Sequence, residues 1–188
     1  MMNRISRIPA ALLAVAALSF ARGAQADLVV NGGFESGDFS GWSAFGDTSS
    51  TAVNTSAPHE GLFIAHFGND TPGGITQTIA TTPGASYDVS FYIRQTLGAS
   101  NHFVFNWDGG AAEQSYIDIN PGFTTLHFPL IASSALTELR FEFDNAGRGL
   151  WDLDAVSVQP HGVPEPATLA LVGLALLIGA RGPRRRRG

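Results

Sequence analysis

The chain has 188 residues, enough for one ordinary domain with extensions, and its 44% hydrophobic and 10% aromatic residues suffice for a folded core. Cysteine is absent, which excludes disulfides, a thiol nucleophile and cysteine-ligated metal centres. All eleven basic residues are arginines. Residues 27–160 hold three of these arginines and fifteen of the sixteen acidic residues, a net charge of −12. Such an acidic segment repels phosphate, which excludes nucleic acid as a partner.

Residues 1–26 have the layout of a secretory signal peptide. Two arginines precede an apolar stretch at 9–20, and the triplet Ala-Gln-Ala at 24–26 fits the small-x-small pattern that signal peptidase cleaves. The apolar stretch is short for a membrane span, which needs roughly 20 residues, so we prefer a signal peptide to a membrane anchor or a first helix of the fold. Signal peptidase is therefore an expected partner, and the mature chain would begin at Asp27.

The sequence of residues 27–160 is typical of β-strands. Apolar and polar residues alternate with a period of two in several windows, most clearly at 86–95 and 138–144, and no window keeps a helical period. Turn-forming residues separate these windows. The pattern predicts strands at 28–30, 51–54, 61–67, 74–80, 86–95, 102–107, 115–119, 123–130, 138–144 and 151–158. Many short strands without helices predict an all-β fold, an antiparallel β-sandwich of two packed sheets.

Three motifs follow one another through this body. N-G-G-F-E-S-G-D-F-S-G-W opens it at 31–42, I-T-Q-T-I and P-G-A-S-Y-D-V-S-F occupy its middle at 75–91, and L-D-A-V-S-V closes it at 153–158. Together they resemble the galactose-binding-like jelly rolls, a group that includes carbohydrate-binding modules. The resemblance implies a jelly-roll sandwich. It leaves the function open, because this fold also serves purely structural roles.

Residues 161–188 form a tail in three parts. Val-Pro-Glu-Pro at 163–166 precedes an apolar segment at 167–180, which would be ~21 Å long as a helix. A basic run follows within 181–188, made of Arg181, Arg184, Arg185, Arg186 and Arg187. Arginines are costly to translocate, so this layout predicts a marginal transmembrane helix whose basic end stays in the cytoplasm.

The tail resembles the PEP-CTERM protein-sorting signal of Gram-negative bacteria, with Pro164, Glu165 and Pro166 as the signature. The resemblance implies an exosortase-type membrane transpeptidase as a partner, which would cut near the signature. It also implies export across the inner membrane, transient anchoring, and a final place at the cell surface or in the extracellular matrix. The family occurs in bacteria that make exopolysaccharide.

The jelly-roll resemblance further implies a structural calcium ion. In the resembling proteins the opening loop and the last strand often share one Ca²⁺ through two carboxylates, which correspond to Glu35 and Asp154 here. Ca²⁺ takes six to eight oxygen ligands, and the glycine-rich loop at 31–41 can add carbonyl oxygens. One position departs from the family pattern, because Ala155 stands where a second aspartate is usual. The alternative is that both residues are ordinary polar turn residues.

A sugar-binding face is a second candidate site. Sugar rings stack on aromatic side chains and receive hydrogen bonds from neighbouring polar groups. Tyr92 and Arg94 lie on the polar side of one predicted strand, and Asn106 and Trp107 lie at the end of the next. We take these four as candidate ligand-binding residues. The alternative for Trp107 is a place in the core.

The chain contains none of the common catalytic motifs, such as G-x-S-x-G, H-E-x-x-H or a phosphate-binding loop. We therefore expect a non-catalytic surface or matrix protein, sorted through its C-terminal signal and associated with exopolysaccharide. A lectin-like carbohydrate-binding module is the alternative. A secreted hydrolase is a third reading, and it would need a cleft with two carboxylates at a suitable separation.

Overall fold

The computed structural model describes residues 26–97, 101–110, 114–117, 122–145 and 149–161. These residues lie within one unit that packs together from Ala26 to Val163. Within the described ranges every regular element is a strand, and no helix is long and apolar enough to cross a membrane. The predicted signal peptide, sorting motif, apolar helix and basic tail lie outside the described residues.

Ten strands make up the domain. They are β1 (Ser43–Gly46), β2 (Thr51–Asn54), β3 (Ile64–Phe67), β4 (Gly73–Ala80), β5 (Ser86–Leu97), β6 (Asn101–Trp107), β7 (Gln114–Ile117), β8 (Thr124–Ile131), β9 (Leu136–Asn145) and β10 (Leu150–Pro160). Nine of them lie where alternation predicted a strand. The sequence analysis missed β1, whose pairing with β4 no local pattern shows.

The predicted strand at 28–30 is wrong. Leu28 donates a backbone hydrogen bond to the Val158 carbonyl, as a strand would. At Val30, however, both backbone groups bond to one side chain, because the N–H donates to Gln77 Oε1 at 2.8 Å and the carbonyl accepts from Gln77 Nε2 at 2.9 Å. The side-chain amide takes the place of a neighbouring strand, and the segment forms a bend.

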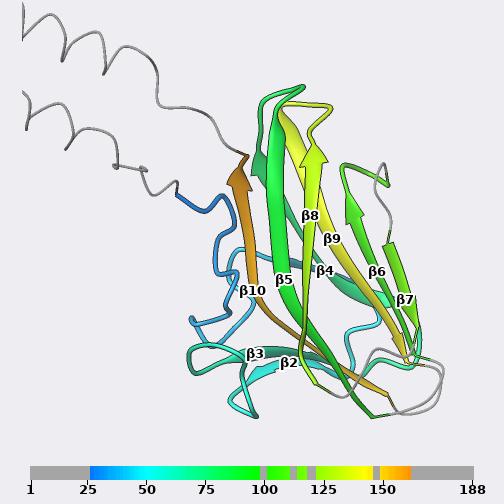
Figure 1. Ribbon diagram of the computed structural model, residues 1–188. Coiled ribbons are helices and arrows are strands. Elements are labelled where there is room, and N and C mark those ends of the chain that lie inside the picture. The colour runs from blue at the N-terminus through cyan, green and yellow to red at the C-terminus, as the bar shows by residue number, and fades with distance from the viewer. Residues whose placement is uncertain (1–25, 98–100, 111–113, 118–121, 146–148, 162–188) are drawn as a thin grey trace, which may run out of the picture. The chain divides into compact units, whose positions relative to one another are not determined.

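The strands form two five-stranded sheets (Figure 1). We call the sheet with the order β1-β4-β9-β6-β7 sheet I and the sheet with the order β2-β3-β10-β5-β8 sheet II. All neighbouring strands run antiparallel. Figure 1 shows β10, β5 and β8 of sheet II side by side. The predicted all-β antiparallel sandwich is confirmed.

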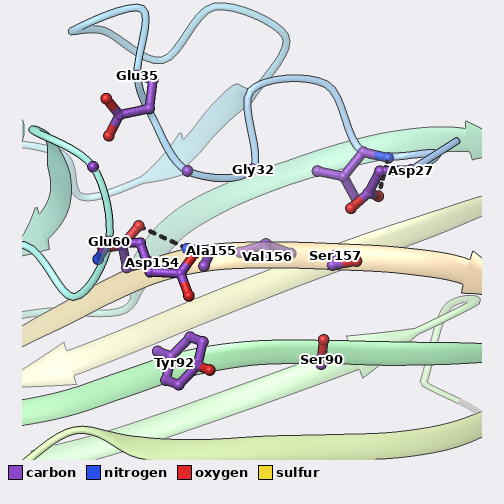
Figure 2. Close-up of a pocket in the computed structure, with 13 residues that line it drawn as sticks. Asp27, Gly32, Glu35, Glu60, Ser90, Tyr92, Asp154, Ala155, Val156 and Ser157 are labelled. Atoms are coloured by element: carbon purple, nitrogen blue, oxygen red, sulfur yellow. Dashed lines mark hydrogen bonds between the residues drawn. The ribbon is translucent and has the colours of Figure 1, made fainter. Parts of the chain in front are cut away.

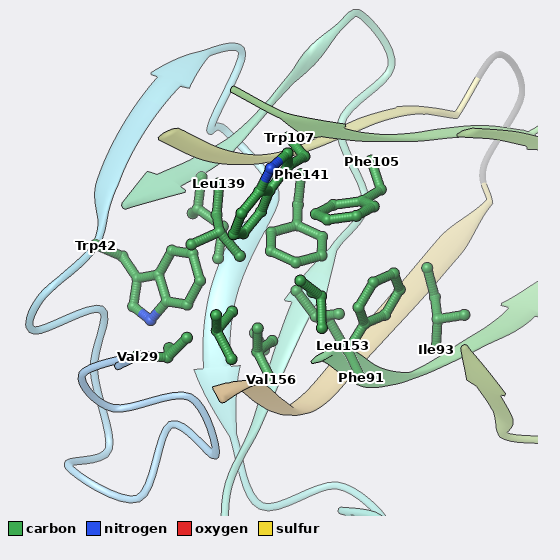
Figure 3. Close-up of a cluster of buried hydrophobic side chains, with 14 of the residues drawn as sticks. Val29, Trp42, Phe91, Ile93, Phe105, Trp107, Leu139, Phe141, Leu153 and Val156 are labelled. Atoms are coloured by element: carbon green, nitrogen blue, oxygen red, sulfur yellow. The ribbon is translucent and has the colours of Figure 1, made fainter. Parts of the chain in front are cut away.

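The core lies between the two sheets and combines many aromatic side chains with aliphatic ones (Figure 3). Phe91 on β5 and Phe141 on β9 are both fully buried and meet edge to face, with ring centroids 5.0 Å apart. Phe105 on β6 joins them at 5.2 Å from each. Burying one such side chain contributes about 1.5–3 kcal/mol. This core lets the domain fold without any disulfide, and it leaves only the outer sheet faces and the loops for binding.

Candidate functional site

The opening motif at 31–42 packs the N-terminal segment onto β10. Gly32 accepts a hydrogen bond from the Val156 N–H at 2.9 Å. A Cβ at Gly32 would lie 1.9 Å from the Val156 carbonyl oxygen, so this close approach of two backbones requires glycine. Phe34 and Trp42 of the same motif are buried and stack at 6.0 Å. The motif therefore has a structural role, and it holds Glu35 beside β10.

Glu35 and Asp154 line one pocket of about 500 Å³ (Figure 2). Figure 2 shows Glu35 on the opening loop above Asp154 on β10, with Tyr92 on the neighbouring strand β5. Asp27 and Glu60 add two more carboxylates to the lining. The structure thus brings the two predicted calcium ligands to the same pocket.

Both carboxylates bind the backbone of the loop between β2 and β3. Glu35 accepts hydrogen bonds from the N–H groups of Leu62 and Phe63 at 3.0–3.1 Å. Asp154 Oδ2 accepts from the N–H groups of His59 and Glu60 at 2.8 and 3.0 Å. Two side chains that lie far apart in the sequence therefore fix one loop over sheet II.

The carboxylate of Asp154 is fully buried. Burial raises its pKa, while the hydrogen bonds from the backbone N–H groups of Glu60, Ala155 and His59 act in the opposite direction. A cation in the pocket would favour the ionised form of this side chain. The oxygen-rich lining fits the chemistry of Ca²⁺. Within the described part of the chain, however, no three His, Asp or Glu side chains are already gathered around one metal position.

The outer face of sheet II is covered where the loop crosses it. Asp152 points outward from β10 but is only 1% exposed, because Arg94 and His66 close over it. The Arg94 Nε–H donates to Asp152 Oδ2 at 2.9 Å, and His66 Nδ1 lies 2.5 Å from Asp152 Oδ1. The ring of Tyr92 is stacked on that of His59 at 3.5 Å. The Arg94 Nη2–H donates to the Ala57 carbonyl of the same loop at 3.4 Å, so Tyr92 and Arg94 both hold the loop.

The outer face of sheet I carries a different set of side chains. Arg140 on β9 places its guanidinium carbon 3.5 Å from the centroid of the Phe45 ring on β1. Its Nη2 also lies 2.6 Å from Glu142 Oε2. In the sheet register Gly74 lies between Phe45 and Glu142, so no side chain separates the ring from the charged pair. The side chains of Arg140 and Glu142 are 33% and 27% exposed.

A polar row crosses sheet I at the level of Arg140. Paired residues on neighbouring strands share a face of the sheet. The register places Ser43, Thr76, Arg140 and Asn106 opposite one another on β1, β4, β9 and β6. Strands lie about 4.8 Å apart, so the row extends over about 14 Å.

The four predicted ligand-binding residues do not form one site. Trp107 is 1% exposed and donates its indole N–H to the Ile131 carbonyl at 3.0 Å, so it belongs to the core and the prediction that it binds sugar is wrong. Tyr92 and Arg94 lie on sheet II, and Asn106 lies on sheet I.

The sequence analysis missed Phe45, Arg140 and Glu142 as candidate ligand-binding residues. The alternation at 138–144 does mark Arg140 and Glu142 as outward-facing. Their contact with Phe45 depends on the pairing of β1, β4 and β9, which no local pattern shows.

Comparison with known proteins supports a binding domain. Residues 26–125 match the family model CBM_4_9, described as "Carbohydrate binding domain". No curated protein matches the chain.

Several solved structures share the fold. TmCBM61 in complex with beta-1,4-galactotriose is 19% identical, with a TM-score of 0.59 over 72% of this chain and 99% of that one. Family 16 Carbohydrate Binding Module-2 is 17% identical, with a TM-score of 0.55 over 70% and 99%. The CBM22-1 xylan-binding domain from Paenibacillus barcinonensis Xyn10C is 16% identical, with a TM-score of 0.52 over 70% and 93%. At these sequence identities, the similarity to the solved structures shows a shared fold. The match to the family model shows the family. Because the family model spans more than half of the sequence, this chain belongs to the CBM_4_9 family of carbohydrate binding domains.

Proposed function

We propose that the domain binds a polysaccharide without cleaving it, and that the outer face of sheet I is the binding surface. The observation that carries this proposal is the contrast between the outer faces of the two central strands, β10 in sheet II and β9 in sheet I. On sheet II the outward-pointing Asp152 and Asp154 are buried beneath side chains and a loop. On sheet I the outward-pointing Arg140 and Glu142 keep about a third of their side-chain surface exposed.

The chemistry of this face supports the proposal. Arg140 is held by Phe45 on one side and Glu142 on the other, so its N–H groups are positioned before a ligand arrives. Such preorganisation reduces the entropy lost on binding. Carboxylate, amide and hydroxyl groups from Glu142, Asn106 and Thr76 surround it. These are the groups that hydrogen-bond sugar hydroxyls.

The solved structures of similar fold support the same class of ligand. One is described in complex with a beta-1,4-linked galactotriose and another as a xylan-binding domain. The family itself is one of carbohydrate binding domains. For this chain, the lectin-like function that was the alternative from sequence therefore becomes our main proposal.

Binding of the chain to a panel of soluble polysaccharides, measured by calorimetry, tests the proposal. Arg140→Ala removes a central hydrogen-bond donor and should weaken binding about tenfold or more. Phe45→Ala should have a smaller effect in the same direction, because it leaves Arg140 unsupported. His127→Ala, on the exposed outer face of sheet II, is the control and should change nothing. Loss of binding in the control with none in Arg140→Ala would move the site to the other sheet.

For the pocket at Glu35 and Asp154 we propose a structural Ca²⁺. Its support is the convergence of two distant carboxylates and the burial of Asp154. Glu35 and Asp154 would hold the ion, and Glu60 and Asp27 lie on the same lining. The ion would supply positive charge and cross-link the opening loop to β10. It has no part in the proposed sugar contacts, which lie on the other sheet.

We also propose that the protein is exported and then sorted to the cell surface or matrix. The support is the sequence at each end, where a stretch with the layout of a signal peptide precedes the domain, and Pro164-Glu165-Pro166, an apolar segment and five arginines follow it. An exosortase-type transpeptidase would process the tail. A polysaccharide-binding domain delivered to this place would attach to, or organise, exopolysaccharide.

A further inference from the structure

The outer face of sheet I has an uneven set of charges. The outward-facing residues of β9 are Glu138, Arg140, Glu142 and Asp144, because the residues between them are buried in the core. Three are acidic and one is basic. The residues paired with them on the neighbouring strands β4 and β6 include no Lys or Arg.

Arg140, the only basic residue among these four, has its charge balanced by a neighbouring carboxylate. Arg140 is paired with Glu142 at 2.6 Å, and the Phe45 ring covers its guanidinium. Glu138 and Asp144 remain, and neither has an ion-pair partner among the residues that the structure describes. The paired charges cancel, which leaves two negative charges towards the two ends of β9.

These two carboxylates are spaced for a polymer. They lie six positions apart along β9, which is roughly 20 Å at 3.4 Å per residue. They lie on opposite sides of the polar row, two and four positions from Arg140, so a sugar chain that runs along β9 and crosses the row at Arg140 meets both. His102, on β6 opposite Asp144, is the nearest titratable neighbour in the register.

We infer that the polysaccharide bound on this face carries free amino groups, as in a partly de-N-acetylated amino-sugar polymer, and that polymers of uronic acids are excluded. This inference rests on the proposed function and specifies its ligand class. Ammonium groups along the polymer pair with Glu138 and Asp144, while hydroxyl groups bind the row at Arg140. A uronate polymer meets the same carboxylates and the −12 charge of residues 27–160.

A pair of matched ligands isolates the charge. Oligosaccharides of β-1,4-linked glucosamine, with free amines or fully N-acetylated, have the same backbone and linkage. Calorimetry of the full chain at mildly acidic pH, where the sugar amines are protonated and surface carboxylates remain ionised, should show about tenfold tighter binding of the form with free amines, because an exposed ion pair changes affinity by up to about fivefold. Added salt should reduce this preference. Polygalacturonate should not bind.

Two variants test whether the preference for free amines arises from the outer face of sheet I. Glu138→Gln and Asp144→Asn keep the shape and remove one charge each, so each should lower the preference for free amines severalfold and leave the N-acetylated form unaffected. Asp88→Asn removes the same charge from the outer face of sheet II and is the control. An equal effect in the control would mean that the amines are attracted by the acidic body as a whole, and would overturn the inference.

The outcomes separate this inference from the proposed function. Binding of the N-acetylated form as tightly as the amine form, or binding of neutral xylan or galactan alone, would overturn the inference and leave polysaccharide binding standing. Binding of polygalacturonate would overturn the inference as well. Failure to bind every polysaccharide tested would overturn both.

Discussion

Asp154 is a buried carboxylate whose hydrogen bonds only partly offset the cost of its charge. Its Oδ2 receives two backbone N–H groups and its Oδ1 receives that of Ala155 at 2.7 Å. Burial still raises its pKa. Glu35, which holds the neighbouring part of the same loop, lies nearer to solvent. The two carboxylates that hold this loop therefore differ in burial.

Removal of calcium should destabilise the domain if our proposal for the pocket holds. A ligand that binds only the folded state stabilises it by about 2.7 kcal/mol at a hundredfold excess over Kd. Chelator should therefore lower the melting temperature by several degrees, and Glu35→Gln or Asp154→Asn should remove most of this difference. Glu138→Gln, a carboxylate on the other sheet, is the control and should keep it. An unchanged melting temperature in chelator, with no heat of Ca²⁺ binding, would rule out the site.

The pKa of Asp154 also predicts a pH dependence in chelator. The raised pKa means that the folded state binds a proton at Asp154 more readily than the unfolded chain does. Protonation of Asp154 therefore stabilises the folded state. This stabilisation is fully present below about pH 3.9, and it is lost as the pH rises through the pKa of the folded state. The stability of Asp154→Asn relative to the parent should therefore increase with pH across that range. Urea unfolding at a series of pH values measures it, and a constant difference would contradict the assigned shift.

At the scale of elements, β10 connects the parts of sheet II. Its pairing with β5 is irregular between Asp154 and Ser157, and Ala155 has a positive φ of 48° there. This irregularity lies beside Val156, to which Gly32 of the opening loop binds. A regular strand would continue the alternation through Asp154. The bulge interrupts it at the place where the loop docks.

Asp152 links β10 to both of its neighbours, since it pairs with Arg94 on β5 and with His66 on β3. Breaking a buried ion pair leaves an uncompensated charge, which typically costs about 3–5 kcal/mol. Asp152→Asn should therefore lower the free energy of unfolding by about 3 kcal/mol in urea titrations. Asp88→Asn, whose histidine partners are exposed, should cost less than about 1 kcal/mol. If both variants lost a similar amount of unfolding free energy, burial of the ion pair would not determine its contribution to stability.

At the scale of the whole molecule, the described residues have a core of their own. The unit from Ala26 to Val163 contains both sheets and every aromatic pair described above. We expect this fragment, expressed alone, to unfold in a single cooperative transition on heating. Circular dichroism and tryptophan fluorescence should report the same midpoint. A fragment with no cooperative transition would show that the domain needs its flanking segments.

The sorting proposal also concerns the whole molecule. Replacing Pro164-Glu165-Pro166 by alanines should leave the C-terminus uncut in a host with an exosortase, because the signature would no longer be recognised. Mass spectrometry of the exported protein decides between the cut and uncut forms. Replacing Arg184 to Arg187 should instead disturb membrane topology, because those charges retain the tail in the cytoplasm. An intact C-terminus in the unaltered protein would refute processing.

The sequence by itself determined the fold class and the position of most strands. Alternation at 86–95 and 138–144 is local, since neighbouring side chains on a strand must point to opposite faces. The motifs at the two ends of the body also led to Glu35 and Asp154 as one pair. Both residues do line one pocket.

Only the tertiary structure decided which polar strand faces remain open. Tyr92 and Arg94 alternate with core residues as regularly as Arg140 and Glu142 do, yet a loop covers the first pair. Trp107 is in the core, because its ring packs near Tyr87 and its N–H reaches the Ile131 carbonyl. Periodicity shows that a side chain leaves the core, whereas its neighbours depend on strand order, register and loop docking between segments far apart in the chain. For that reason the meeting of Phe45 with Arg140 appears only in the folded domain.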